Sequence, residues 1–209
     1  MQVKLVAYTQ FAPEYAGFSP EDVCGFAMRS CHSRRAMHEL VSEEEKRETA
    51  RRIRFAKKVG HFSVLEHLSF TFSVSGVSRI LTHQLIRHRI ASYSQMSIRA
   101  TNPGQMRTIK PSTVIGRGIG EFDRACEEAI KYYNRLMEQG VPREDARFIL
   151  PSGIETHIVV TMNARELLHF IRLRDSEHAQ WEIRQLAQKM FELAKAVAPT
   201  IFESIPPNV

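Results

Sequence analysis

Residues 67–75, HLSFTFSVS, alternate strictly between polar and apolar side chains. Leu68, Phe70, Phe72 and Val74 hold the apolar positions, and serine or threonine holds the positions between them. Because successive side chains of a strand point to opposite faces of a sheet, the pattern predicts a strand with one apolar and one polar face. This is the clearest strand in the chain, and the rest of the fold must cover its apolar face.

The other elements follow from periodicity, capping residues and turn residues. Two more strands are expected, at residues 2–8 and 157–163. Helices are expected over about 20–31, with Ser19 as N-cap; from Ser42 to Lys58, opened by a capping box of Ser42 and Glu45; between Gly76 and Arg87; and over about 121–139, 142–147, 164–174 and 176–197. The segment from Asn102 to Gly120, with two prolines and four glycines, is expected to be a mobile loop.

Strands and helices do not alternate regularly along the chain, so a doubly wound parallel sheet is not expected. The order instead predicts an α+β fold, a mostly antiparallel twisted sheet covered by several helices. A chain of 209 residues fits one domain, and no internal repeat divides it. We therefore expect residues 1–209 to form a single domain.

Composition narrows the class of protein. With 43% hydrophobic and 25% charged residues, the chain is typical of a globular protein and not of a disordered one. No apolar run approaches the roughly 20 residues that span a bilayer, and the N-terminal MQVKLVAYTQ lacks the apolar segment of a secretion signal. The three cysteines show no CxxC spacing and are interpreted as reduced thiols. These features predict a cytoplasmic protein without a membrane partner.

The basic residues indicate an anionic ligand. The formal net charge is +6, and 21 of the 29 basic residues are arginine. The planar guanidinium group suits bidentate recognition of phosphate or carboxylate, so a small phosphorylated ligand is favoured over nucleic acid. An Arg-rich nucleic-acid-binding module stays open as an alternative, although no RNP-type strand or helix-turn-helix pattern supports it.

The familiar catalytic motifs are missing. The chain has no GxSxG nucleophile turn, no GxxxxGK[ST] phosphate loop and no GxGxxG turn after a strand. Its nine histidines form no HExxH motif or Cys/His cluster, so no metal site is expected.

Polar groups gather instead in four blocks near predicted strand and helix ends. Residues 87–99, RHRIASYSQMSIR, combine three arginines and a histidine with small hydroxyl and amide groups, as expected of a segment that holds an anion. The blocks are GHFSVLEH (60–67), HQLIRHRIASYSQMSIR (83–99), GVPREDARFILP (140–151) and TMNARELLHFIRLRDSEHAQWEI (161–183). Within the second block, Tyr93 and Met96 are interpreted as packing residues.

The RHR tripeptide followed by Ser92, Ser97 and Arg99 resembles the RHRxxSxxxxSxR signature of flavin-dependent thymidylate synthases. The other blocks resemble that family's GHxSxxEH, GVPRExAR, NAR and LRxxxxAQWEI segments, in the same order from Gly60 to Ile183. The resemblance implies FAD as cofactor, NADPH as reductant, methylenetetrahydrofolate as carbon donor and dUMP as substrate. It also implies a homotetramer with active sites at subunit junctions.

The resemblance assigns roles to individual positions. The positions that match flavin contacts are His61, Ser63, Arg87, His88, Arg89, Asn163, Arg165 and His169. The positions that match nucleotide contacts are Gln84, Arg87, Gln95, Ser97, Arg99, Arg147 and Arg174. Arg174 matches the residue placed against the uracil edge and is the expected catalytic residue. Ser97 is assigned to binding, because no base is visible beside it to activate a hydroxyl.

The implied reaction is the reductive methylation of dUMP to dTMP, in which no protein nucleophile takes part. Flavin supplies the hydride, and a permanently charged guanidinium at Arg174 favours the electron-rich form of the pyrimidine. Two departures from the family pattern keep another pyrimidine nucleotide open as substrate. Ser94-Gln95 stands where relatives often have Asn-Glu, and Ala100 stands where an aromatic residue is common.

Overall fold

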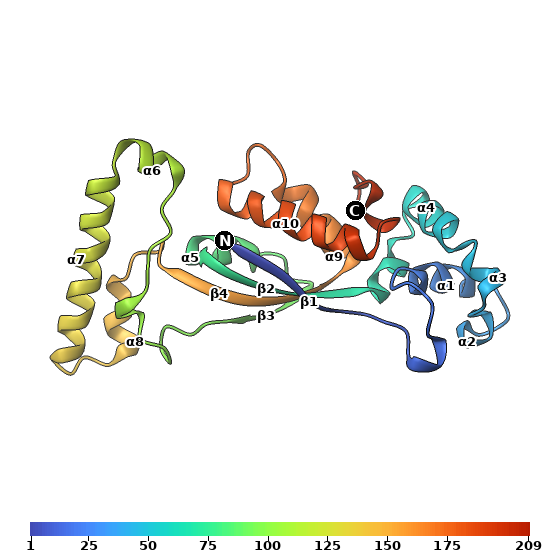
Figure 1. The fold of residues 1–209 in the computed structure, drawn as a ribbon, viewed down its shortest axis with the longest axis horizontal. Helices are drawn as coiled ribbons and strands as arrows, with labels where there is room; N and C mark the ends of the chain where they lie inside the picture. Colours follow the sequence, from blue (N-terminus) through green and yellow to red (C-terminus); the bar gives the residue numbers. More distant parts are fainter. The chain divides into compact units, whose positions relative to one another are not determined.

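The computed structural model describes all of residues 1–209 and contains one four-stranded antiparallel sheet (Figure 1). The strands are β1 (Gln2–Tyr8), β2 (Ser69–Ser78), β3 (Ala91–Gln95) and β4 (Glu155–Asn163), in the order β1-β2-β4-β3. Together with many helices, this sheet confirms the predicted α+β fold. No helix combines the length and the apolar composition that a membrane crossing requires.

The chain divides into two compact units. The first unit comprises Met1–Gln2, Val74–Arg87 and Ser94–Ile158, and the second unit comprises Val3–Ser73, His88–Tyr93 and Val159–Val209. Each strand therefore contributes residues to both units. The expectation of a single domain stays a prediction.

The clearest predicted strand, β2, is confirmed. Leu68, Phe70, Phe72 and Val74 are all fully buried, as the alternation requires. The strand continues beyond Gly76, which has a positive φ of 66° and lies against the main chain of Met1. Glycine adopts this left-handed conformation at little energetic cost, so the strand can bend at Gly76 without ending.

The first unit contains α5 (Arg79–Leu85), α6 (Ser112–Arg117), α7 (Ile119–Glu138) and α8 (Arg143–Ala146). Contrary to expectation, the segment from Asn102 to Gly120 is not a loop throughout, because Asn102, Pro111 and Gly118 are N-caps of helical turns. Its mobility stays a prediction. The side chain of Asn102 caps a 3-10 turn, and Pro111 is the N-cap of α6. Thr108 between them forms a β-bridge with Ile154. The predicted helix at 121–139 is confirmed as α7.

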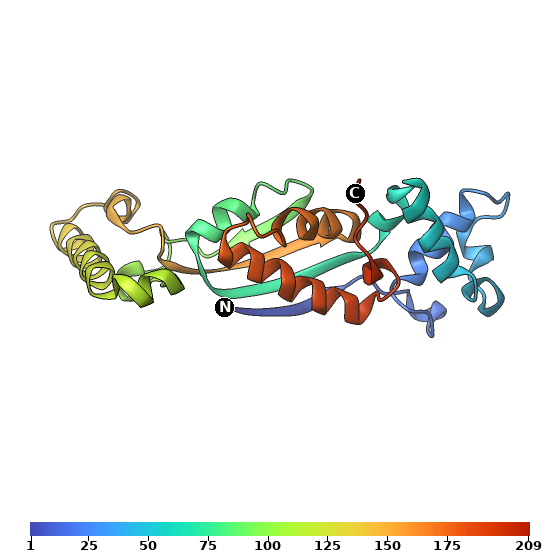
Figure 2. The same cartoon turned by 90° about the horizontal axis from the view of Figure 1, so that it is seen from above.

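The second unit contains α1 (Asp22–Ser30), α2 (Met37–Leu40), α3 (Glu43–Lys46), α4 (Thr49–Val59), a 3-10 helix (Phe62–His67), α9 (Ala164–Arg174) and α10 (Trp181–Val197). In Figure 2, α9 and α10 lie side by side, and they pack against each other. The predicted helix at 164–174 is confirmed as α9. The last helix begins later than predicted, since the side chain of Gln180 accepts hydrogen bonds from the main-chain N–H groups of Glu182 and Ile183.

Two predictions near the N-terminus are wrong in detail. Ser19 does not cap α1; its main-chain N–H instead donates to Asp22. The helix from Ser42 to Lys58 is two helices, of which Ser42 caps only α3. The break falls where the buried Thr49 hydroxyl bonds to the carbonyl of Lys46 and to the Asp22 carboxylate.

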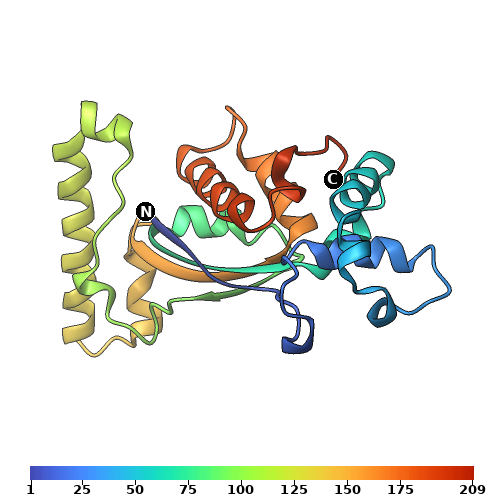
Figure 3. The same ribbon diagram turned by 45° about the vertical axis from the view of Figure 1, so that its right-hand side comes forward.

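A glycine allows α1 and α4 to pack closely, as seen in Figure 3. A Cβ atom added at Gly25 would lie 2.4 Å from the Cβ of Thr49. Thr49 is the first residue of α4. The break between α3 and α4 therefore lies where α4 meets α1.

Candidate functional site

The predicted site residues separate by unit. Apart from Arg87, the residues that match flavin contacts lie in the second unit, together with Arg174: His61, Ser63, His88, Arg89, Asn163, Arg165, His169 and Arg174. Apart from Arg174, the residues that match nucleotide contacts lie in the first unit: Gln84, Arg87, Gln95, Ser97, Arg99 and Arg147. The RHR motif spans the boundary, which falls between Arg87 and His88.

Within the second unit, Arg165 joins the first and fourth sequence blocks. Its guanidinium lies 2.6 Å from the Glu66 carboxylate and 5.9 Å from the centre of the Phe62 ring. The main-chain N–H of Ala164 donates to the carbonyl of Leu68 over 2.7 Å. These contacts bring the start of α9 against the segment that carries His61 and Ser63.

Helix ends set the positions of three predicted flavin contacts. Gly60 ends α4 in the left-handed conformation, with φ 78°, and His61 follows it half-buried. Ser63 lies exposed two residues later, in the 3-10 helix. Asn163 caps α9, since its side-chain oxygen accepts from the N–H of Glu166 over 2.9 Å. Its capping role is structural, and its flavin contact stays a prediction.

The side chain of His88 is buried between those of Glu166 and Arg174. Only 4% of its surface is exposed. Its Nδ1 lies 3.3 Å from Glu166 Oε1, and its Nε2 lies 3.1 Å from Nε of Arg174, which donates to it. The Phe170 ring meets the imidazole edge-on, with 5.0 Å between ring centroids. The fold thus links the RHR motif to both ends of α9.

This arrangement determines the protonation of His88. Arg174 Nε always carries a hydrogen, so Nε2 must be an acceptor and the ring proton must be on Nδ1, facing Glu166. Burial, followed by the charges of Arg174 and His169, lowers the pKa of His88 to about 4. Burial also raises the pKa of Glu166. The imidazole is therefore neutral near pH 7.

Tyr93 has a role beyond the packing expected of it. Its hydroxyl donates to the main-chain carbonyl of His88 over 2.7 Å. Burial raises the pKa of Tyr93, so the hydroxyl keeps its proton. Tyr93 belongs to β3, and this contact ties the strand to the main chain of the RHR motif.

The remaining predicted flavin contacts are more accessible. Arg89 is exposed next to buried His88 in the sequence. His169 is half-buried, and its Nδ1 lies 3.1 Å from the carbonyl oxygen of Val209. Arg87, which matches both kinds of contact, is exposed at the end of the first unit's second segment.

In the first unit, Ser97 organises a tight turn. Its hydroxyl accepts from the N–H groups of Arg99 and Ala100 over 3.2 and 3.4 Å. Its carbonyl accepts from both the N–H and the hydroxyl of Thr101. The Ser97 hydroxyl thus has a structural role in this turn, and its assignment to binding stays a prediction.

Glu144 brings two predicted nucleotide contacts together. Its carboxylate lies 2.8 Å from Nε of Arg99, and its main-chain carbonyl accepts from Nε of Arg147 over 2.9 Å. Arg143 donates to the carbonyls of Arg99 and Ala100. The second and third sequence blocks therefore meet at this point.

Gln95 is held by two threonines. Its side-chain nitrogen donates to the hydroxyls of Thr82 and Thr156 over 3.1 and 3.3 Å. Both threonines are buried. These bonds occupy the donors of the amide, so its carbonyl oxygen is the atom suited to contact a ligand. Gln84, on α5, is half-buried.

Arg79 is a cation that the sequence blocks did not include. It is the first residue of α5, and its Nη1 is buried without a hydrogen-bond partner. Burial, followed by the charge of Arg147, lowers the pKa of Arg79. A guanidinium group with a buried, unpaired nitrogen beside another cation is costly unless an anion compensates it.

Comparison with known proteins identifies the family. A family model described as "Thymidylate synthase complementing protein" matches residues 5–200. The flavin-dependent thymidylate synthase of Sulfolobus acidocaldarius is 43% identical over 212 residues, which cover 100% of this chain and 78% of that protein. The one from Geobacter sulfurreducens is 43% identical over 207 residues, covering 97% and 87% of the two chains. This chain belongs to the flavin-dependent thymidylate synthases. The predicted family is confirmed, and with it an enzyme that uses a flavin.

Two residues of this flavin-dependent thymidylate synthase were missed at the sequence level. Glu166 follows the NAR tripeptide directly and lies in the first turn of α9. Acidic residues are common at that position because they interact favourably with the helix dipole, so the sequence pattern did not distinguish Glu166. Arg79 precedes the RHR motif on α5, and nothing in its neighbours distinguishes it from a surface cation. Glu166 is distinguished only by its contact with His88, and Arg79 only by its buried, unpaired Nη1.

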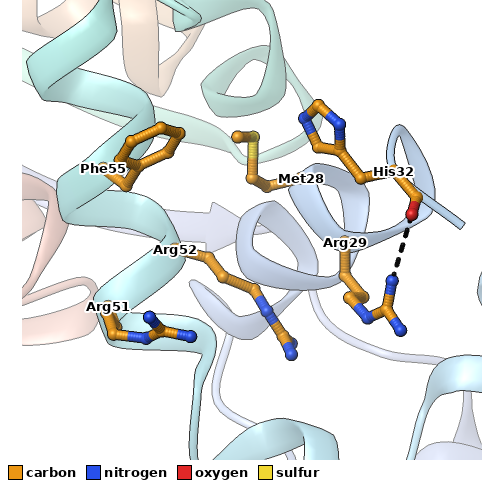
Figure 4. Close-up of a pocket in the computed structure, with 6 residues that line it drawn as sticks. All are labelled: Met28, Arg29, His32, Arg51, Arg52 and Phe55. Atoms are coloured by element: carbon orange, nitrogen blue, oxygen red, sulfur yellow. Dashed lines mark hydrogen bonds between the residues drawn. The ribbon is translucent and has the colours of Figure 1, made fainter.

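A separate pocket lies between α1 and α4, with a volume of about 320 Å³ (Figure 4). It is lined by Met28, Arg29, His32, Arg51, Arg52 and Phe55, none of which belongs to the sequence blocks. Glu45 pairs with Arg29 and Arg52. Two of the three arginines that line this pocket are therefore already paired with a carboxylate of the second unit, and the third, Arg51, pairs with Glu48. No group of three or more His, Cys, Asp or Glu side chains in residues 1–209 is placed to hold a metal ion.

Proposed function

We propose that the protein methylates dUMP to dTMP, with methylenetetrahydrofolate as carbon donor and FAD and NADPH as the source of the hydride. Thymidylate synthesis is the activity of its family, and the substrate and donors are the proposal. The observation that carries it is the hydrogen bond from Arg174 to buried His88. This bond joins the RHR motif to the arginine expected at the uracil edge.

The chemistry of the second unit fits a flavin dinucleotide. Arg89 and Arg165 expose guanidinium groups that suit a pyrophosphate, and Arg165 lies at the start of α9, where helix N–H groups also favour anions. His61, Ser63, Asn163 and His169 provide hydrogen-bonding groups nearby in the same unit. We assign these residues, with Arg87 and His88, to FAD. A flavin with a single phosphate would leave part of this set unused.

The first unit offers a site for the nucleotide phosphate. Arg99 and Arg147 meet at Glu144, and Arg79 adds a guanidinium group with an unpaired Nη1 beside Arg147. One carboxylate does not balance these three cations, so a phosphate dianion would be strongly attracted. We assign the phosphate to this cluster, with Ser97, Gln84 and the Gln95 carbonyl oxygen as further contacts to the nucleotide.

Arg174 is the residue to which we assign transition-state stabilisation. C5 of uracil attacks a methylene electrophile most readily from an enolate-like form whose negative charge rests on the pyrimidine oxygens, and a guanidinium group there stabilises that form. Arginine stays protonated at every working pH, and His88 restrains its Nε. Bound flavin supplies the hydride that completes the methyl group. The chain itself then orients the ligands and provides charge, without a covalent intermediate.

The assembly and location also belong to this proposal. We propose a homotetramer whose active sites form at subunit junctions, and a cytoplasmic location for it. Analytical ultracentrifugation of the flavin-loaded protein tests the first. A particle of about four times the 24.0 kDa chain mass is expected, and a monomer that turns over would contradict it.

The deciding experiment is tritium release from 5-tritiated dUMP. We expect release that requires methylenetetrahydrofolate, NADPH and FAD together, because substitution at C5 expels the hydrogen there. Omitting each component in turn is the control. A protein that binds FAD without releasing tritium would refute dUMP methylation.

A second candidate is methylation of another pyrimidine nucleotide. The observation that favours it is Gln95, whose amide is tied to Thr82 and Thr156 where many relatives carry a carboxylate. Tritium release from 5-tritiated dCMP under the same conditions tests it. The alternative of a nucleic-acid-binding module is no longer favoured, because the chain belongs to a family of enzymes.

A further inference from the structure

Glu166 is a buried carboxylate whose position calls for an explanation. It lies in the first turn of α9, and 7% of its surface is exposed. Charged side chains are rarely buried unless a specific partner compensates them. The partner here is Nδ1 of His88, 3.3 Å from the carboxylate oxygen.

Asn163, Glu166, His88 and Arg174 contact one another in series. Asn163 caps the N–H of Glu166 and so fixes the start of the helix. Nδ1 of His88 faces the Glu166 carboxylate with 3.3 Å between nitrogen and oxygen, and His88 Nε2 accepts the Nε hydrogen of Arg174. A proton on Nε2 instead would oppose the Arg174 donor directly, since both groups would then be donors.

We infer that Glu166 is a positioning residue, which holds the His88 ring proton on Nδ1 so that Nε2 can accept from Arg174. It acts on Arg174 through His88 and touches no ligand itself. The inference rests on the proposed function in one respect, that Arg174 is the residue serving the reaction. Its structural part, the tautomer of His88, is independent of any substrate.

A purely structural role for Glu166 makes a different prediction. An acidic residue in the first turn of a helix stabilises the helix dipole, and its side chain fills space in the interior. Loss of those effects lowers stability but leaves the His88 proton where it is. The tautomer of His88 therefore separates the two roles.

The test uses two variants of the full chain, Glu166→Leu and Glu166→Gln. Leucine is apolar and offers no acceptor, while glutamine keeps the shape and a carbonyl oxygen that can accept the Nδ1 hydrogen. ¹⁵N-histidine NMR reports which ring nitrogen carries the proton, and a His88→Asn sample assigns the signal. Thermal unfolding and the flavin absorbance of each variant establish folding and FAD loading. Turnover is then measured against dUMP concentration.

We expect the wild type and Glu166→Gln to have the proton on Nδ1 and to turn over within a few-fold of each other. In Glu166→Leu the single tautomer is lost and kcat falls about 10- to 100-fold, the loss typical of an unpaired buried donor, while KM for dUMP changes little. A Glu166→Leu protein with the Nδ1 tautomer and normal kcat would overturn the inference. So would a Glu166→Gln protein as impaired as Glu166→Leu, because charge and not acceptance would then matter.

The outcomes also separate this inference from the proposed function. If the wild type releases no tritium from dUMP, the proposed function fails, and the NMR result still decides the role of Glu166. If Glu166→Leu does not fold, Glu166→Gln decides alone. A proton on Nε2 in the folded wild type would refute the inference whatever the activity.

Discussion

Nε of Arg174 donates a hydrogen bond to Nε2 of His88 over 3.1 Å, inside the second unit. The two residues come from separate sequence blocks, and the bond makes the buried imidazole a support for the guanidinium group. A side chain with many rotatable bonds is thereby restrained before a ligand binds, which lowers the entropic cost of using it.

This support makes Arg174 sensitive to conservative replacement. Arg174→Lys keeps the positive charge but lacks the Nε–H group that donates to His88. Lysine has a single side-chain nitrogen, which would have to serve both His88 and the ligand. We expect kcat for tritium release to fall about 100- to 1,000-fold, the range for loss of an electrostatic stabiliser. Arg174→Ala should lose at least as much while FAD remains bound, as measured by flavin absorbance after gel filtration. Near-normal turnover in Arg174→Ala would contradict the assigned role.

The buried His88 predicts a pH dependence of stability. Its pKa is about 4 when folded and near 6.5 when unfolded, so the unfolded chain binds more protons between these values. Stability should therefore fall as the pH drops from about 6.5 towards 4, by a few kcal/mol at most at roughly 1.4 kcal/mol per pH unit. Urea unfolding midpoints across this pH range measure the effect.

Titration of Glu166 changes the stability with pH in the opposite direction to titration of His88. Its pKa is raised by burial, so the folded state holds its proton to higher pH than the unfolded state does. Its contribution to stability is lost as the pH rises through this interval. Glu166→Gln removes the opposing contribution, and we expect its stability to fall more steeply towards acid than that of the wild type. An identical slope in Glu166→Gln and the wild type would mean that the carboxylate does not titrate there.

The close contact between Gly25 and Thr49 predicts that adding one methyl group at position 25 lowers the stability of the protein. A Cβ at position 25 would lie 2.4 Å from the Thr49 Cβ and 2.7 Å from its Cα, so α1 and α4 must separate. We expect Gly25→Ala to destabilise the protein by about 1–3 kcal/mol. Gly120→Ala in α7 is the matched control, since nothing lies within 4 Å and alanine favours a helix. Thermal unfolding compares them, and equal midpoints for the two variants would show that the helices are not in close contact.

Arg79 predicts a change in nucleotide affinity. Arg79→Met removes a guanidinium group beside Arg147 without removing the volume of the side chain. We expect KM for dUMP to rise about tenfold or more, because a hydrogen bond to a charged group is lost, while kcat changes less. Arg117→Met, at an exposed position on α6, is the control and should leave KM unchanged. An unchanged KM in Arg79→Met would exclude Arg79 from the phosphate site.

Local sequence patterns predicted the parts of the fold in which the residues of a single segment indicate its secondary structure and its buried face. The alternation around Phe70 and Phe72 predicted β2, and the apolar spacing after Asn163 predicted the bounds of α9. The order of the polar blocks predicted the family. These succeed because the periods of strands and helices are properties of a short stretch of chain.

Pairings between distant segments were decided by the tertiary structure. β3 was not predicted, because Ser92 and Ser94 face solvent at the edge of the sheet and give no apolar alternation. The helix break before Thr49 lies where this residue contacts Gly25, which no capping pattern records. Each case involves a partner on another element.

The candidate site divides in the same way. The residue types and their order, including His88 and Arg174, can be taken from the amino-acid sequence. The burial of His88 between Glu166 and Arg174, and the position of Arg79 beside Arg147, follow from the folded chain. The physical reason is that a hydrogen bond, a tautomer and a pKa depend on distance and burial, which the fold alone supplies.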